Sequence, residues 1–172
     1  MAVGEQGRVC IVGCGRWMRR DDQIGLKIAR RVAEAHSPNT RVIETESPTV
    51  DVAAHLDGDT QLLVLVDAAR KAPGHPPGSW QRIDFRRERE RLAASAPPLD
   101  THSLSVDAAL ALAEEMRLLP PEVWIYVVAV ENVEQGEAMS SSLLDVTEQL
   151  TEHIIEDIEA WFCSKGNGAG SG

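Results

Sequence analysis

The chain has 172 residues, of which 43% are hydrophobic, and it carries a formal net charge of −10. This composition excludes a disordered protein and suits one globular core, and no apolar run is long enough to cross a bilayer. The acidic charge repels phosphate backbones, so nucleic acid is not expected as the main partner. Without a long apolar run, a membrane is not expected as a partner either.

Strands and helices alternate along the first half of the chain. The apolar run Arg8–Gly13 predicts a buried strand that ends at a glycine, and Gln23–Glu34 has the apolar spacing of an amphipathic helix. A short strand at Thr40–Glu44 and a short helix at Val50–Leu56 follow. The next run, Gln61–Asp67, is apolar up to its final aspartate, as a central parallel strand covered on both faces should be.

The second half continues the alternation, with proline-rich loops between the elements. We expect loops where Pro and Gly gather, an edge strand where polar and apolar residues alternate, and a solvated helical turn at the charge run. The predicted elements are a loop at Ala72–Gly78, a strand at Ser79–Phe85, the turn at Arg86–Arg91, a loop at Ala93–Asp100, a helix at Ser103–Leu118, a strand at Val123–Val130, a loop at Glu131–Ser140 and a helix at Ser141–Trp161.

This order of elements predicts an α/β fold. We expect a three-layer sandwich in which a mostly parallel, twisted sheet of about five strands has helices on both faces. Right-handed crossovers place the carboxyl ends of parallel strands at one edge, where open α/β sheets bind their ligands. Asp22 follows the first strand, Asp67 ends the third and His102 immediately precedes a helix. We therefore expect these three side chains around one crevice.

Two carboxylates and one imidazole offer oxygen and nitrogen donors to a borderline divalent ion such as nickel or zinc. Each residue also has a structural explanation. Asp21 or Asp22 can cap the helix that follows, and since both cannot cap the same donors well, we expect Asp22 to face the crevice. Asp67 can accept hydrogen bonds from loop amides, and a lone histidine is more often a satisfied polar residue. The metal hypothesis therefore depends on the three residues together.

The Gly13-Cys14-Gly15 turn also raises the possibility of a dinucleotide site. The Rossmann pattern needs a third glycine at position 18, which is Met18 here. Asp21 and Asp22 would repel a pyrophosphate at the start of the helix. A nucleotide cofactor is therefore not expected, and no serine or cysteine nucleophile with a neighbouring histidine is visible in the sequence.

Residues 1–165 are predicted to form a single domain, and the Gly/Ser-rich residues 166–172 to form a disordered tail. The N-terminus has no basic start followed by an apolar stretch, so we expect no signal peptide. The chain has three cysteines, without the second pair that a structural zinc site would need. Reduced thiols in a cytoplasmic protein are the simplest interpretation.

Taken together, the motifs resemble the endopeptidases that mature the large subunit of NiFe hydrogenases. The first is a strand with Gly-x-Gly, two acidic residues and a glycine; the second is an apolar strand that ends in Asp-Ala; the third is a histidine that leads into a Leu/Ala-rich helix. In chain order the matching segments are Val12–Gly25, Leu62–Ala68, Pro77-Gly78, Thr101–Glu115, Pro120–Val130, Gly136 and Ser140–Ser142.

The resemblance implies a nickel-dependent endopeptidase that removes the C-terminal extension of a NiFe hydrogenase large-subunit precursor. It implies Asp22, Asp67 and His102 as the metal-contacting and catalytic residues. The nickel would be supplied by the precursor, and the enzyme would be an aspartic-type or metal-dependent hydrolase. We expect it to act as a monomer.

The sequence departs from the family pattern at three places. Arg16 stands where an asparagine is usual, Gln23 stands where a glycine is frequent, and Glu46–Thr49 replaces a loop rich in Asp and Gly. That loop is associated with substrate binding or cleavage. The departures motivate an alternative function, a chaperone-like binder of the metallated precursor without proteolytic activity. A role of Asp21 as a helper base stays open.

Overall fold

The computed structural model describes residues 8–35, 39–70, 74–88 and 101–166, of which 101–105 and 166 are described by their backbone alone. The strands are β1 (Val9–Cys14), β2 (Thr40–Thr45), β3 (Leu62–Arg70), β4 (Trp80–Asp84) and β5 (Glu122–Val130). The helices are the 3-10 turn η1 (Arg20–Gln23), α1 (Ile24–Glu34), α2 (Pro48–His55), α4 (Thr101–Glu115) and α5 (Ser141–Gly166), and residues 85–88 are helical as well.

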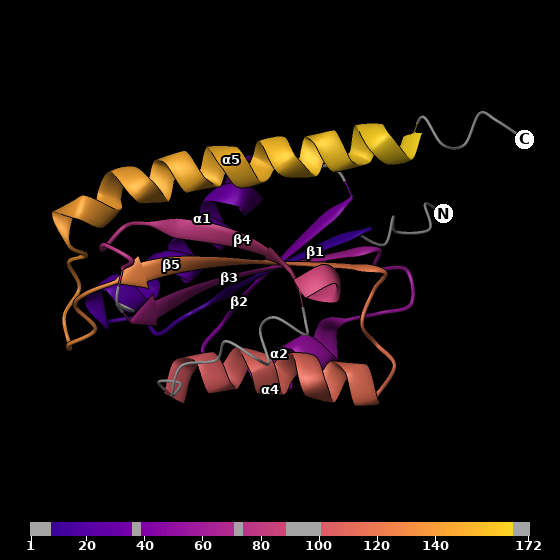
Figure 1. Ribbon diagram of the computed structural model, residues 1–172, viewed down its shortest axis with the longest axis horizontal. Helices are drawn as coiled ribbons and strands as arrows, with labels where there is room; N and C mark the ends of the chain where they lie inside the picture. The colour runs from indigo at the N-terminus through magenta and orange to yellow at the C-terminus, as the bar shows by residue number, and fades with distance from the viewer. Residues whose placement is uncertain (1–7, 36–38, 71–73, 89–100, 167–172) are drawn as a thin grey trace, which may run out of the picture.

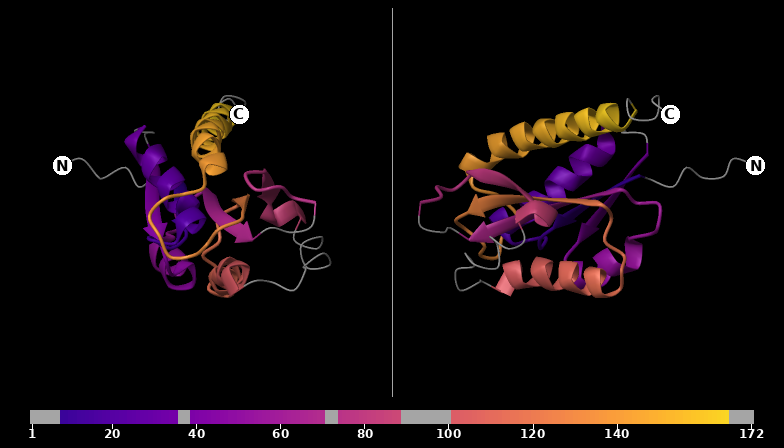
Figure 2. Two further views of the ribbon diagram at one scale, coloured as in Figure 1. Left: turned by 90° about the vertical axis from the view of Figure 1, so that its left-hand side faces the viewer. Right: turned by 45° about the vertical axis from the view of Figure 1, so that its right-hand side comes forward.

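The five strands form one sheet in the order β2-β1-β3-β5-β4. All neighbours are parallel except β4, which pairs antiparallel with β5. The position of β4 at the edge of the sheet is the predicted one. Helices α1 and α5 cover one face of the sheet, and α2 and α4 cover the other (Figure 1). The left view of Figure 2 shows α5 and α4 nearly end-on, on opposite sides of the strands. The predicted three-layer α/β fold is confirmed.

The core follows from the two-residue period of the strands. In β3, Val64 and Val66 pack in the hydrophobic cluster that includes side chains of α1 and α5. Leu63 and Leu65 pack in a second hydrophobic cluster, which includes side chains of α2 and α4. Since side chains alternate between the faces, Asp67 belongs with Leu63 and Leu65 on the α4 side of the sheet. The strand pattern thus decides which helix layer faces this aspartate.

The end of β3 differs from the prediction. The strand continues three residues past Asp67 to Arg70, because β5 runs alongside it as far as the pair Arg70↔Val130. On its other side, the pairing of β3 with β1 stops at Gly13↔Val66. Asp67 therefore does not end β3, but it is the first residue of β3 beyond the β1 pairing, at the carboxyl edge of the sheet.

The helix limits also differ from the prediction. His102 was expected to precede a helix, yet α4 already begins at Thr101, so the backbone of His102 is in its first turn. The last helix, α5, extends past the predicted end at Trp161 to Gly166. Gly166, assigned to the tail 166–172 by the sequence, is therefore the last residue of α5. The predicted loop at Ala93–Asp100 and residues 167–172 of the predicted tail lie outside the described residues. Among the described helices, none combines the length and apolarity needed to span a membrane.

Candidate active site

The candidate site lies at the point where the strand order reverses. From β1 the chain goes first to β2 on one side and then to β3 on the other, so the reversal falls between β1 and β3. Open α/β sheets bind ligands beyond the carboxyl ends of such a pair. The segment after β1, with Asp22, and Asp67 of β3 both lie there. The prediction that these two residues meet at one edge agrees with this topology.

Helix α4 brings its N-terminal end to the same edge. Because α4 leads within a few residues into the start of β5, its last residues lie at the amino edge of the sheet. Fifteen helical residues span about 22 Å, so its first residues lie at the opposite edge. Figure 1 shows that end of α4 below the sheet, at the same end of the molecule as the arrowheads of β3 and β5. The backbone of His102 is thus at the carboxyl edge, while its side chain lies outside the described part of the structure.

Two glycines allow the segment after β1 to approach the sheet. A Cβ on Gly25 would lie 2.3 Å from the carbonyl oxygen of Cys14 and 2.4 Å from that of Val66. A Cβ on Gly15 would lie 2.1 Å from the carbonyl oxygen of Asp22. Any larger residue would push α1 and Asp22 away from β3. The glycines of the first motif therefore serve close backbone packing, which explains their spacing without a nucleotide.

Asp22 and Asp67 form a buried carboxylate pair, with exposed fractions of 2% and 8%. Burial, and after it the negative charge of Asp22, raise the pKa of Asp67 to about 7, although a hydrogen bond from the Ala68 N–H to Oδ1 (2.9 Å) acts in the opposite direction. Burial also raises the pKa of the Cys14 thiol, and the charges of Asp67 and Asp22 add to this effect. The three side chains are thus close enough to interact electrostatically.

This donor set suits a divalent cation. An ion between Asp22 and Asp67 would turn their repulsion into attraction to a shared positive charge. Burial and the two nearby carboxylates raise the pKa of the Cys14 thiol, which disfavours the thiolate as long as no cation is bound. Among the described side chains, no three of His, Cys, Asp or Glu lie close enough to hold a metal, and the side chain of His102 is not in that set. The site of Asp22, Asp67 and His102 therefore stays a prediction.

The expected capping of α1 by an aspartate is wrong. The N-cap of α1 is Gln23 and that of η1 is Arg19, and neither makes a side-chain cap hydrogen bond. Both aspartates lie within the η1 turn, and Gln23 stands between Asp22 and the first residue of α1. Asp21, which is 0% exposed, instead accepts hydrogen bonds from Asn132 and Ser140 in the connection between β5 and α5. Asp21 therefore holds a distant part of the chain.

Sequence reasoning missed a third carboxylate near the pair. Asp107 of α4 contributes to the raised pKa of Asp67, and burial raises the pKa of Asp107 itself. The available signal was its position less than two helical turns after His102, on a helix that begins at the carboxyl edge. The region is therefore more acidic than the two aspartates alone would make it, which further favours a cation.

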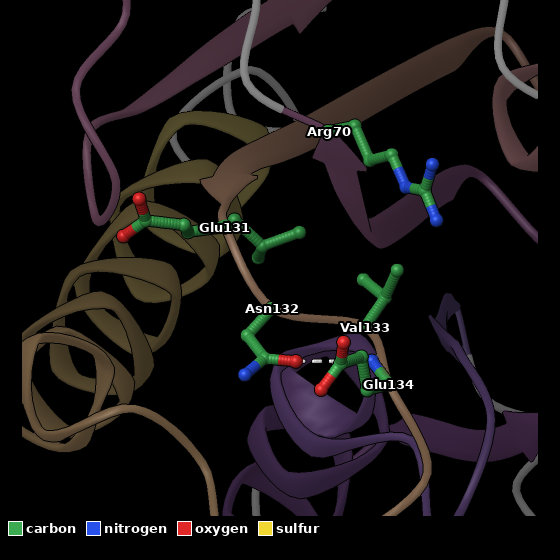
Figure 3. A pocket seen from close by; sticks show the side chains of 6 residues that line it. Arg70, Glu131, Asn132, Val133 and Glu134 are labelled. Carbon is green, nitrogen blue, oxygen red and sulfur yellow. Dashed lines mark hydrogen bonds between the residues drawn. The ribbon is translucent and has the colours of Figure 1, made fainter.

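Two further features border the site. The N–H of Trp17 donates to Oε1 of Glu46 (2.8 Å), so the segment that departs from the family pattern contacts the loop after β1. A pocket of about 510 Å³ lies at the same edge, between the end of β3 and the β5–α5 connection (Figure 3). It is lined by Arg70, Val130, Glu131, Asn132, Val133 and Glu134.

No family model and no curated protein matches the sequence. Solved structures do match. The [NiFe] hydrogenase maturation protease HybD from Thermococcus kodakarensis is 24% identical, with a TM-score of 0.71 over 88% of this chain and 98% of that one. The hydrogenase maturating endopeptidase HybD from E. coli is 16% identical, with a TM-score of 0.73 over 89% and 93% of the two chains.

The chain has the fold of the hydrogenase maturation proteases. A hydrogenase 3 maturation protease gives the same result at 20% identity and a TM-score of 0.65, over 87% of this chain and 90% of that one. The fold implied by the sequence motifs is thereby confirmed. At these identities the likeness concerns the fold, and the activity has to be argued from the site.

Proposed function

We propose that the chain is a nickel-dependent endopeptidase that removes the C-terminal extension of a NiFe hydrogenase large-subunit precursor. The observation that carries the proposal is the buried pair of Asp22 and Asp67 at the switch point of the sheet. It is supported by the fold, which is shared with proteins named as hydrogenase maturation proteases. The backbone of His102, at the carboxyl edge, is compatible with a third ligand from α4.

In this proposal the nickel is part of the substrate. Asp22, Asp67 and His102 would contact the ion already seated in the precursor, and the remaining coordination positions would stay with ligands of the precursor. An unloaded precursor would then bind weakly, because nothing would offset the charges of the carboxylate pair. The protease would in this way distinguish loaded from unloaded precursor.

The nickel would polarise the scissile carbonyl or activate a water molecule for attack. This chain would position the ion, and Asp67 would release a proton when the ion binds. With a pKa of about 7, Asp67 is protonated in about half of the molecules at neutral pH and must release that proton to contact a cation. Recognition of the loaded precursor should therefore strengthen as the pH rises through 7.

The test is cleavage of a nickel-loaded precursor, followed by mass spectrometry of the released C-terminal peptide. Asp22→Asn, Asp67→Asn and His102→Ala should each abolish cleavage. The matched controls are Asp145→Asn on the outer face of α5 and His75→Ala in the loop before β4, both at exposed positions, and these should cleave at the wild-type rate. Equal cleavage by wild type and His102→Ala would refute the metal-site assignment.

A second candidate is a binder of the metallated precursor without proteolytic activity. It is favoured by the segment that departs from the family pattern, because this segment begins α2 instead of forming an open loop. Pro48 is the first residue of α2, the Ser47 N–H donates to Oγ1 of Thr45 (2.8 Å), and Glu46 holds Trp17. A stable complex with loaded precursor, in which no peptide is released even with nickel present, would favour this function over the protease.

A further inference from the structure

The β5–α5 connection, residues 131–140, is tied to the segment after β1. The Gly136 N–H donates to the carbonyl oxygen of Met18 (2.8 Å), and the Arg20 N–H donates to that of Gly136 (3.0 Å). Met18 and Arg20 have φ angles of 62° and 44°, in the left-handed region that residues other than glycine rarely adopt. Such conformations persist only where surrounding contacts enforce them. The tie therefore fixes the backbone immediately before Asp22.

Asp21 completes this tie with four hydrogen bonds. Its Oδ1 accepts from the Ser140 N–H (2.7 Å), and its Oδ2 accepts from the Asn132 N–H (2.9 Å) and the Ser140 hydroxyl (2.9 Å). Its own N–H donates to the carbonyl oxygen of Asn132 (2.9 Å). Asp21 thus holds both ends of the connection. With both carboxylate oxygens engaged by donors of the connection, Asp21 is suited to positioning the connection against the segment after β1.

The pocket of Figure 3 shares a wall with this connection, since Asn132 and Val133 line it. Its other wall is Arg70, three residues after Asp67 on β3, which corresponds to about 10 Å along a strand. Figure 3 shows the side chains of Arg70 and Val133 directed into the space between β3 and the connection. Asp21 is thus bonded to the pocket wall and is adjacent in sequence to Asp22.

The lining suits a polypeptide. The volume of about 510 Å³ is within the usual range of ligand sites and is enough for more than one side chain of a peptide. Val130 and Val133 offer apolar contact to a side chain, and Arg70 and Asn132 carry groups that hydrogen-bond peptide carbonyls. A guanidinium has five N–H donors, so a contact elsewhere in the protein leaves donors for a ligand.

We propose that this pocket receives the stretch of precursor polypeptide beside the scissile bond, with an apolar side chain against Val130 and Val133, and that Asp21 is the positioning residue that keeps the pocket in register with Asp22. The inference rests on the proposed function, because it assumes that the ligand is the precursor.

The pocket is tested with Val133→Asp, which places a charge where an apolar side chain is expected. Kinetics of cleavage and the dissociation constant of the nickel-loaded precursor are measured for wild type and variant. We expect at least a tenfold rise in KM and in the dissociation constant, with kcat within twofold of wild type. Wild-type values of both constants in the variant would overturn the assignment of the pocket.

Asp21 is tested with Asp21→Asn, which replaces an accepting oxygen by an NH₂ group that faces a donor. We expect kcat to fall at least tenfold in a variant that still gives a native near-UV circular dichroism spectrum. Ser140→Ala removes only the hydroxyl donor and should lower kcat less, and it decides the matter if Asp21→Asn does not fold. The exposed Ser142→Ala is the matched control. A wild-type kcat in Asp21→Asn would show that Asp21 stabilises the fold without positioning the site. If Asp21→Asn does not fold, a wild-type kcat in Ser140→Ala leads to the same conclusion.

A failure of the proposed function gives a different result. If wild type binds loaded precursor but never cleaves it, the endopeptidase assignment fails. The assignment of the pocket is then tested by the dissociation constant of Val133→Asp alone. The positioning by Asp21 is in that case measured as the loss of nickel-dependent affinity, expected to be at least tenfold, in Asp21→Asn or Ser140→Ala. An unchanged nickel dependence in these variants would overturn it.

Discussion

Asp67→Asn should make the metal-free protein more stable at pH 8 while it abolishes cleavage. In the folded chain, burial and then the charge of Asp22 hold the pKa of Asp67 at about 7, against an ordinary value of 3.8. The folded state therefore binds more protons than the unfolded state between about pH 4 and 7. The free energy of unfolding falls as the pH rises through this window, and the loss is complete above pH 7.

The size of the effect follows from the same two values. The gap between 3.8 and about 7, at roughly 1.36 kcal/mol per pKa unit, corresponds to roughly 4 kcal/mol. The amide removes this penalty, and its oxygen can still accept the hydrogen bond from the Ala68 N–H. An amide in a tight site has its own packing cost, so we expect the variant to be about 2–4 kcal/mol more stable than wild type at pH 8. At pH 5 this advantage should be smaller by about 2–3 kcal/mol, because most of the Asp67 penalty develops between pH 5 and pH 7.

The assay is urea unfolding of wild type and variant at pH 5 and pH 8, with a chelator present because a divalent cation would offset the repulsion. The exposed Asp145→Asn should differ from wild type by less than about 0.5 kcal/mol at both pH values. If the difference between Asp67→Asn and wild type is the same at pH 5 and pH 8, Asp67 does not titrate in this window and the reasoning is refuted.

Three further predictions concern the frame around the site. Gly25→Ala should destabilise the fold by about 3 kcal/mol or more, because the added Cβ meets two carbonyl oxygens within 2.4 Å. The control Gly58→Ala, whose Cβ has nothing within 4 Å, should change the midpoint of urea unfolding little. Equal midpoints for the two variants would contradict the packing argument. Tyr126→Phe removes a buried hydroxyl that donates to Oδ2 of Asp157 in α5 (2.5 Å), and should lower the free energy of unfolding by about 1–2 kcal/mol. Cleavage should be unchanged, and a loss of cleavage would link this face of the sheet to the site. Iodoacetamide at pH 8 should label the exposed Cys163 in the native protein but not Cys14, because burial raises the pKa of the Cys14 thiol. The labelled residues are identified by mass spectrometry of the alkylated peptides. Labelling of Cys14 before Cys163 would contradict the burial of Cys14.

Strong local patterns predicted most of the elements correctly. The apolar runs around Val64 and Ile125 became parallel strands, and the alternating segment before Asp84 became the antiparallel edge strand. The limits were less accurate, because an element ends where its neighbour stops supporting it. β3 runs past Asp67 because β5 continues beside it, and the sequence of residues 68–70 does not predict that pairing.

The site shows the same division. The motif spacing and the rule for open α/β sheets predicted that Asp22 and Asp67 lie at one edge of the sheet. The sequence also suggested that one of two adjacent aspartates caps a helix, and this failed because the partners of Asp21 are Asn132 and Ser140, 111 and 119 residues away along the chain. Local propensity has no information about donors so remote in sequence.

The sequence by itself determined the order and type of the elements, and with them the edge of the sheet at which the acidic residues gather, because periodicity and strand crossover act over short stretches of chain. Only the tertiary structure decided how those residues differ. It buried Asp67 beside another carboxylate, which raises its pKa, and it engaged both oxygens of Asp21 in the β5–α5 connection. Burial and charge proximity belong to the assembled fold, so no pattern of neighbouring residues could specify them.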